Sequence, residues 1–208
     1  MDLPRLQSVR GEPGPVEADP GSAFWQQVAP VVLCENVGGG TPAQSTRVRT
    51  AWDDQSWRLL FEVEDARPWS TLTEHDGPLW TEEVVEVFID PVGDLEGYFE
   101  VEVNPAGAVV DVVLRRVASG WRKDFGWHVD GLRHRARLTA TGWAAELAIP
   151  FEALAAPVPR PGTCWRVNFL RIDRPDGTGT EAELSAWSPT GIRNFHRAQS
   201  FGTVEFVA

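Results

Sequence analysis

Aromatic rings and carboxylates are the side chains of this sequence that could do chemistry. It holds ten Trp and ten Phe beside a single Tyr. Flat rings pack cores and also stack on ligands, so the position of each ring decides its role. Four lie in or beside expected strands and are assigned to packing: Trp52, Trp57, Trp143 and Trp165. Five lie in expected connections: Trp69, Trp80, Trp121, Trp127 and Trp187. A large ring in a connection either covers the end of a sheet or contacts a ligand. For any one of these rings, covering a sheet end is the expected role.

Carboxylates gather on one face of a predicted three-stranded meander. If Asp90 pairs across its turn with Tyr98, then Glu86, Glu100 and Glu102 share a face, because side chains alternate along a strand. The intervening valines and Ile point the other way. The sequence therefore predicts one apolar face and one acidic face.

The acidic face requires compensation. Continuing the pairing through the turn at 104–107 puts Asp111 opposite Glu100, and like charges placed so destabilise a sheet by up to roughly 1 kcal/mol per pair. Arginines of other strands such as Arg171, a bound Ca²⁺, or a hydroxyl-rich ligand could offset these charges. The alternative is a solvated acidic face.

Paired carboxylates also suggest a glycosidase, with Glu86 acting beside Glu100 or Glu102. Such enzymes need two carboxyl groups about 5–10 Å apart, one of them with a raised pKa. The sequence does not mark which acid is desolvated. Nor do the histidines have HxH or HExxH spacing: His75, His128, His134 and His196. No motif in the sequence is typical of an enzyme.

Short alternating strands must position these side chains. Period-two alternation predicts a hairpin over 46–63 and the meander over 84–116. Further strands are expected at 133–140, 143–149, 164–172 and 202–207, and one helical turn at Phe151–Leu154. The predicted fold class is all-β, an antiparallel β-sandwich that is jelly-roll-like.

One domain accounts for most of the chain. Residues 1–23 are rich in Pro, Gly and acids, which predicts an extended N-terminal arm without core residues. Residues 24–208 are expected to form a single β-sandwich. The connections at 65–81 and 117–132 are too long for simple turns, and long connections in compact domains often carry function.

Charge and composition limit the partners. The 208 residues include 19 basic and 30 acidic side chains, a formal charge of −11 that repels phosphate backbones and anionic lipids. Nucleic acid and membrane are therefore not expected partners. No signal peptide or apolar span is visible, so a cytoplasmic location is the default expectation. The sequence does not indicate an oligomeric state. Cys34 and Cys164 are expected as buried thiols that form at most one disulfide.

One continuous segment is familiar. The run DGPLWTEEVVEVFIDP at 76–91 closely resembles the signature of family 9 carbohydrate-binding modules. Segments at 52–54, 98–105 and 185–190 follow in the family's order, and the resemblance covers about residues 20–207. The sequence is most similar to free-standing family 9-like proteins rather than to modules appended to xylanases.

The resemblance implies non-catalytic binding of carbohydrate, associated with carbohydrate catabolism. Family members are β-sandwiches that hold glucose- or xylose-type sugars, often at glycan chain ends, between two aromatic rings. Here the first ring corresponds to Trp80. The second falls at Phe195, where better-known members have Trp.

The polar part of the implied site has one departure from the family. The hydrogen-bonding acid and amide correspond to Glu86 and Asn104. Glu102 stands where the family has a basic residue, and Arg171 is the candidate to supply that cation from the neighbouring strand. A lost cation removes charge-assisted hydrogen bonds, so the departure bears on sugar identity and affinity.

The resemblance requires no cofactor, although structural calcium is frequently present in the family. Asp90, Asp173 and Asp176 are the candidate ligands for one structural Ca²⁺, without the spacing of an EF-hand loop. Two other functions stay open beside sugar binding. One is the glycosidase considered above, and the other is a protein-interaction module whose sugar site has decayed.

Overall fold

Fourteen β-strands and four 3₁₀ turns form the regular structure of the computed structural model, which describes residues 2–177, 179 and 181–208. The strands are β1 Arg5–Arg10, β2 Val31–Val32, β3 Cys34–Glu35, β4 Thr46–Trp52, β5 Ser56–Glu64, β6 Val84–Asp90, β7 Gly97–Val103, β8 Val109–Val117, β9 Gly120–Asp124, β10 Arg133–Leu138, β11 Gly142–Pro150, β12 Cys164–Asp173, β13 Glu183–Ala186 and β14 Gly202–Val207. The turns are η1 Trp25–Gln27, η2 Leu79–Thr81, η3 Phe151–Leu154 and η4 Ala198–Ser200. Among these residues no helix has the length and apolar character that a membrane crossing requires.

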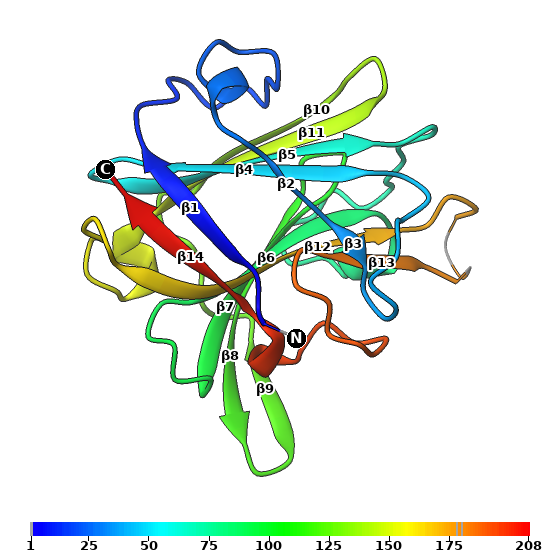
Figure 1. The fold of residues 1–208 in the computed structure, drawn as a ribbon. Helices are drawn as coiled ribbons and strands as arrows, with labels where there is room; N and C mark the ends of the chain where they lie inside the picture. The colour runs from blue at the N-terminus through cyan, green and yellow to red at the C-terminus, as the bar shows by residue number, and fades with distance from the viewer. Residues whose placement is uncertain (1, 178, 180) are drawn as a thin grey trace.

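The strands follow one another around a curled sheet. Its order is β10-β11-β5-β4-β1-β14-β12-β6-β7-β8-β9, and Figure 1 shows the sheet folding back on itself. The predicted all-β, jelly-roll-like sandwich is confirmed, as are the 46–63 hairpin and the turn at Phe151–Leu154. One pairing differs from the antiparallel expectation. Strand β1 is parallel to both neighbours, β4 and β14, and joins the two halves.

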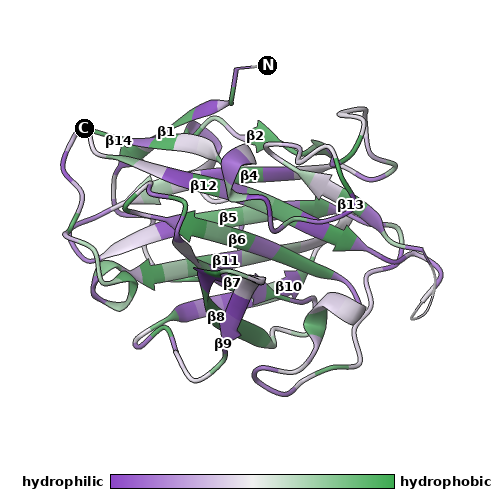
Figure 2. Ribbon diagram, turned by 90° about the horizontal axis from the view of Figure 1, so that it is seen from below, coloured by the Kyte–Doolittle hydropathy of each residue, from purple (hydrophilic) through white to green (hydrophobic). Residues whose placement is uncertain are grey.

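The main core lies between the two halves. It takes the inward side chains of β4, β5 and β11 on one side and of β6, β7, β12 and β14 on the other. Hydrophobic segments run along these strands in Figure 2. The four strand tryptophans, Trp52, Trp57, Trp143 and Trp165, are at most 2% exposed, which confirms their role in packing.

The N-terminal segment is part of this structure. Beyond β1, residues 11–30 cross the outer face of β4 and β5, where Trp25 packs with Leu60. Ala18 is fully buried. The expectation that residues 1–23 contribute nothing to the core is therefore wrong. Strand β1 pairs in parallel with strands far away in the sequence. Such pairing leaves no hairpin pattern from which its place in the sheet could be predicted.

The two cysteines are free. Cys34 is half-buried and Cys164 is exposed, so the expectation of two buried thiols is wrong for Cys164. Cys164 is the first residue of β12 and follows the surface turn at 160–163. Position at a strand end outweighs the general preference of Cys for burial.

A buried ion pair holds the segment against the sheet, which gives a first prediction. Glu146 on β11 pairs with Arg58 on β5, both side chains 2% exposed, and also accepts the Glu17 and Ala18 N–H groups. Replacing Glu146 by Ala leaves Arg58 buried without a counter-charge, so we expect a loss of about 3–5 kcal/mol in urea unfolding.

The matched control is Glu64→Ala. Glu64 forms an ion pair with Arg47 in which the two side chains are 46% and 36% exposed, so we expect a loss below about 1 kcal/mol. Equal losses in the two variants would contradict the assignment of Glu146 as the anchor of the segment.

Candidate functional site

The meander β6–β7 has the predicted register. Glu86 lies opposite Glu102, and Phe88 lies opposite Glu100. The three glutamates therefore share the outer face of this half of the sheet, while Val85, Val87 and Ile89 face the main core. The outer face is not uniformly acidic, because apolar side chains of β6, β7, β8 and β12 form a second core around the glutamates.

The position of Asp111 differs from the prediction. Asp111 on β8 lies opposite Val101, not Glu100. The turn after β7 is one residue longer than expected, since the Asn104 N–H donates to the Ala108 carbonyl. A shift of one residue moves every side chain of a strand to the other face. Asp111 is therefore removed from the glutamates.

A cavity of about 330 Å³ opens above the three glutamates. Its wall combines aromatic, cationic and amide side chains. They include Trp80, Lys123, Arg193, Asn194, Phe195 and His196. Four of the residues predicted as a site thus meet here: Trp80, Glu86, Glu102 and Phe195.

Burial and mutual repulsion control the charge of the glutamates. They are 1–3% exposed, and one oxygen from each lies within 4.8 Å of the others. Burial, followed by the neighbouring carboxylates, raises the pKa of Glu86 and of Glu102 well above the ordinary value. Lys123 lies 3.4 Å from Glu100 and partly offsets the charge. The cavity floor therefore combines two carboxyl groups of raised pKa with a third that lies beside the Lys123 ammonium.

The two aromatic rings are seated differently. Trp80 belongs to η2 and is 37% exposed, with the Lys123 ammonium 5.6 Å from its ring centre and Phe125 packed beside it at 6.3 Å. Phe195 is 7% exposed and belongs to the second core. Trp80 therefore presents a partly exposed ring to the cavity, whereas Phe195 is a fixed part of the wall.

Lys123 and His196 are cavity residues that the sequence reasoning missed. The connection expected at 117–132 contains strand β9, in which Trp121 and Lys123 alternate onto one face. His196 stacks on Phe88 at 5.3 Å and hydrogen-bonds the Tyr98 hydroxyl at 2.7 Å, and burial lowers its pKa. The alternation of β9 was a usable signal, but nothing local marks His196.

Asn104 does not line the cavity. Its Nδ2 donates to the Ser70 Oγ at 2.6 Å and to the Leu72 carbonyl at 2.8 Å, and its Oδ1 accepts the Ala108 N–H. Asn104 is fully buried. These bonds tie the β7–β8 turn to the connection before η2.

Arg171 lies on the opposite side of the sheet from the glutamates. It pairs with Val85 on β6, so it faces away from Glu86. Its guanidinium lies 2.9 Å from Asp65 and 3.1 Å from Asp173. The hypothesis that Arg171 offsets the glutamates is therefore wrong. Burial, and then the charge of Asp65, raises the pKa of Glu83 beside this pair to about 8.

The residues predicted as calcium ligands are used otherwise. The Asp90 carboxylate accepts the N–H groups of Val92, Gly93 and Leu95 and so closes the β6–β7 turn. Asp173 is paired with the Arg171 cation, and Asp176 is exposed. Asp173 also has a carboxylate oxygen within 4.8 Å of those of Asp65 and Glu83. The structural Ca²⁺ with these candidate ligands stays a prediction.

The other four tryptophans of the connections have packing roles. Trp187 belongs to the main core and Trp127 packs on it through Phe99. Trp121 contacts Tyr98, and the Trp69 ring N–H donates to the Arg174 carbonyl. Only Trp80, among these five rings, lines the cavity.

The chain is similar to known proteins in sequence and in fold. A model of the carbohydrate family 9 binding domain-like family matches residues 19–208. Endo-1,4-beta-xylanase A of Thermoanaerobacterium saccharolyticum is 25% identical over 184 residues, which is 87% of this chain. The chain spans 14% of that enzyme's length.

Solved structures share the fold at low sequence identity. A Bacteroides uniformis protein assigned to carbohydrate binding superimposes with a TM-score of 0.78 at 20% identity, covering 99% of this chain and 100% of that one. A family 9 carbohydrate-binding module of Caldicellulosiruptor kristjanssonii was solved with cellotriose and with glucose. The TM-scores are 0.73 and 0.70 at 16% identity, covering 99% and 98% of this chain and 94% and 95% of those.

The raised pKa values predict how stability depends on pH. The Glu102 carboxyl group has its ordinary pKa of 4.5 in the unfolded chain and a higher pKa in the folded chain. Its favourable contribution to the free energy of unfolding is therefore complete below pH 4.5 and is lost as the pH rises through the folded pKa. Glu102→Gln keeps a neutral group at this position. From about pH 5 to pH 8 the free energy of unfolding in urea should fall in the native chain. In this variant we expect the fall to be smaller by at least about 1 kcal/mol.

Glu64→Gln is the control for the pH experiment, since Glu64 is 46% exposed. It should follow the native pH profile. A Glu102→Gln profile parallel to the native one would mean that the carboxyl group is ionised in the folded protein.

The Arg171 ion pairs predict a large stability effect away from the cavity. Arg171 and Asp65 are 1% and 2% exposed. Arg171→Met leaves the nearby carboxylates without a cation, and we expect a loss of about 3–5 kcal/mol in urea unfolding at neutral pH. Arg47→Met, at a half-exposed pair, should cost below about 1 kcal/mol. A nearly neutral Arg171→Met would show that the pair is not a stabilising contact.

Proposed function

The chain belongs to the carbohydrate family 9 binding domain-like family, and from this premise we propose that the cavity at Trp80 binds carbohydrate without catalysing a reaction. One observation carries the proposal. A partly exposed tryptophan ring lines a cavity whose floor is three buried carboxyl groups. That combination matches the two surfaces of a sugar, an apolar ring face and an edge of hydroxyl groups.

Stacking on Trp80 supplies the apolar contact. Its ring is large and partly exposed, and its contacts with Lys123 and Phe125 hold it in place. A ring that is ordered before binding loses little conformational entropy when a ligand stacks on it. Phe195 contributes an apolar wall rather than a second exposed ring.

The carboxyl groups supply the polar contacts. Sugar hydroxyls donate hydrogen bonds to carboxyl oxygens and accept them from ammonium groups, so the glutamates and Lys123 can satisfy both roles. The Glu100 Oε2 and Glu102 Oε2 atoms are buried and have no hydrogen-bond partner. Leaving such atoms unpaired is costly, and a hydroxyl group would relieve that cost.

The size of the cavity favours a small ligand. About 330 Å³ is near the low end of the range of roughly 300–1,000 Å³ for ligand pockets, which favours one or two sugar units at a chain end over the middle of a polymer. We therefore assign glucose- or xylose-type sugars. The Caldicellulosiruptor module, solved with cellotriose and with glucose, supports this choice of ligand class.

Titration of the protein with glucose, cellobiose and xylobiose by calorimetry tests the proposal. We expect saturable binding of at least one sugar with Kd in the millimolar range or below, about −4 kcal/mol or stronger. Trp80→Ala should weaken that binding at least about tenfold, since a stacking ring contributes around 1 kcal/mol or more beyond its buried area. Leu138→Ala removes another exposed apolar side chain, 68% exposed on β10, and should leave the affinity unchanged.

Two results would overturn the proposal. Absence of binding to a broad glycan panel at millimolar concentration, by a protein with native circular dichroism, would favour an interaction module. Turnover of an aryl glycoside that is lost in Glu86→Gln would instead establish the glycosidase alternative.

A further inference from the structure

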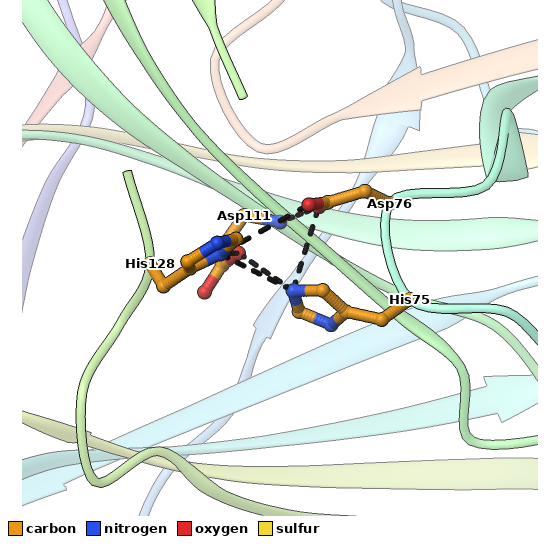
Figure 3. Close-up of side chains that lie close together, drawn as sticks. All are labelled: His75, Asp76, Asp111 and His128. Atoms are coloured by element: carbon orange, nitrogen blue, oxygen red, sulfur yellow. Dashed lines mark hydrogen bonds and ion pairs between the residues drawn. The ribbon is translucent and has the colours of Figure 1, made fainter. Parts of the chain in front are cut away.

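Four side chains outside the sugar cavity converge on one point. His75 and Asp76 come from the β5–β6 connection, Asp111 from β8 and His128 from the β9–β10 connection (Figure 3). One ligand atom from each lies within 4.8 Å of all the others. This cluster is on the face of β8 opposite the glutamates. It takes no part in the proposed sugar contacts.

The two imidazole rings turn nitrogen atoms toward each other. His75 Nε2 lies 3.4 Å from His128 Nδ1. Both atoms also face the Asp111 Oδ1, at 3.1 Å and 3.2 Å, respectively. The Asp76 carboxylate closes the group, 3.6 Å from His75 and 3.9 Å from His128. Two lone-pair nitrogens and two carboxylates thus surround a single small volume.

These separations are those of a tetrahedral metal site. Zn²⁺ binds nitrogen and oxygen at about 2.0–2.2 Å, which separates neighbouring ligand atoms of a tetrahedron by about 3.3 Å. The two nitrogens and the Asp111 Oδ1 are separated by 3.1–3.4 Å, and the two Asp76 oxygens lie 3.6 Å and 3.9 Å from one nitrogen each. Three ligand atoms thus already have tetrahedral separations, and a rotation of the Asp76 side chain is needed to supply the fourth.

The donor atoms select the kind of metal. Imidazole nitrogen suits Zn²⁺ and its first-row neighbours, whereas Ca²⁺ and Mg²⁺ prefer oxygen ligands throughout. We propose that His75, Asp76, Asp111 and His128 form a binding site for a divalent transition metal of the Zn²⁺ class.

The cluster is built rather than incidental. Asp111 is 2% exposed, and its Oδ2 accepts the Val129 N–H at 2.6 Å, which directs Oδ1 at the two histidines. The Asp76 N–H donates to the Val109 carbonyl at 3.0 Å and fixes the connection on β8. Outer hydrogen bonds of this kind orient metal ligands in known sites.

The site is accessible from solvent. The His75 and His128 side chains are each 52% exposed, so a cation reaches the ring nitrogens without opening the core. The Asp76 and Asp111 carboxylates lie 3.1–3.9 Å from the ring nitrogens, so a cation at this point has two acidic neighbours.

Calorimetric titration of the chelator-treated full chain with Zn²⁺ tests the proposal. We expect one Zn²⁺ per chain with micromolar or tighter Kd. Removal of an outer hydrogen-bond partner typically costs 10–100-fold in metal affinity, so loss of a ligand in His75→Ala or His128→Ala should cost at least about 100-fold. His134→Ala is the control, because His134 is exposed, lies outside the cluster and has its Nε2 3.1 Å from the Gly107 carbonyl. It should bind as the native chain does.

Substitution by Co²⁺ supplies a second readout. A four-coordinate site gives intense visible absorption, and this should be present in the native chain and His134→Ala and lost in Asp76→Asn. Ca²⁺ in large excess should not displace the metal. None of these variants changes a residue that lines the sugar cavity, so these results do not depend on sugar binding.

Three outcomes would overturn the proposal. The first is the absence of saturable Zn²⁺ binding in the micromolar range. The second is binding that is equally strong in the native chain, His75→Ala and His128→Ala, which would place the metal elsewhere. The third is full competition by Ca²⁺, which would mark a general acidic surface rather than an imidazole site.

Discussion

Alternation of side chains across the β6–β7–β8 meander is the constraint on which the rest of the structure depends. Because neighbouring residues of a strand point to opposite faces, β6 and β7 supply valines to the main core and glutamates to the cavity. The turn after β7 then decides the face of every residue on β8. It places Asp111 beside the two histidines and away from Glu100. Both the cavity and the His–Asp cluster therefore follow from one register.

Three buried carboxyl groups in contact require an arrangement that limits their charge. Desolvation disfavours the ionised forms, and proximity disfavours ionising all three together. The charge is limited by the raised pKa values of Glu86 and Glu102 and by the Lys123 ammonium beside Glu100. The second cluster, around Asp65 and Asp173, is handled differently, by the guanidinium of Arg171. The glutamate cluster therefore has carboxyl oxygens available at the cavity floor, whereas the carboxylates of Asp65 and Asp173 face a buried cation.

Local pattern was sufficient for the sandwich, the hairpin and the β6–β7 register, because each follows from period-two alternation and turn residues. It was also sufficient to bring Glu86 and Glu102 to one face, whereas Trp80 was placed beside them by the resemblance to family 9 modules. It failed where position depends on pairing between distant strands. Arg171 was assigned to the wrong face because the β6–β12 register, which sets it opposite Val85, has no local signal. The parallel β1 and the seat of His196 under the cavity are likewise decided by partners far away in the sequence.

The β5–β6 and β9–β10 connections each contribute to both sites. The β5–β6 connection carries His75 and Asp76 and leads directly into η2 with Trp80, while Phe125, which packs on Trp80, lies three residues before His128. Leu79 anchors the first connection in the second core and Val129 anchors the other in the main core, and hydrogen bonds to β8 and to Asn104 add to this packing. A cation between His75 and His128 would link the same two connections directly. The rim of the cavity and the His–Asp cluster are thus two ends of one scaffold, built on opposite faces of a single strand set.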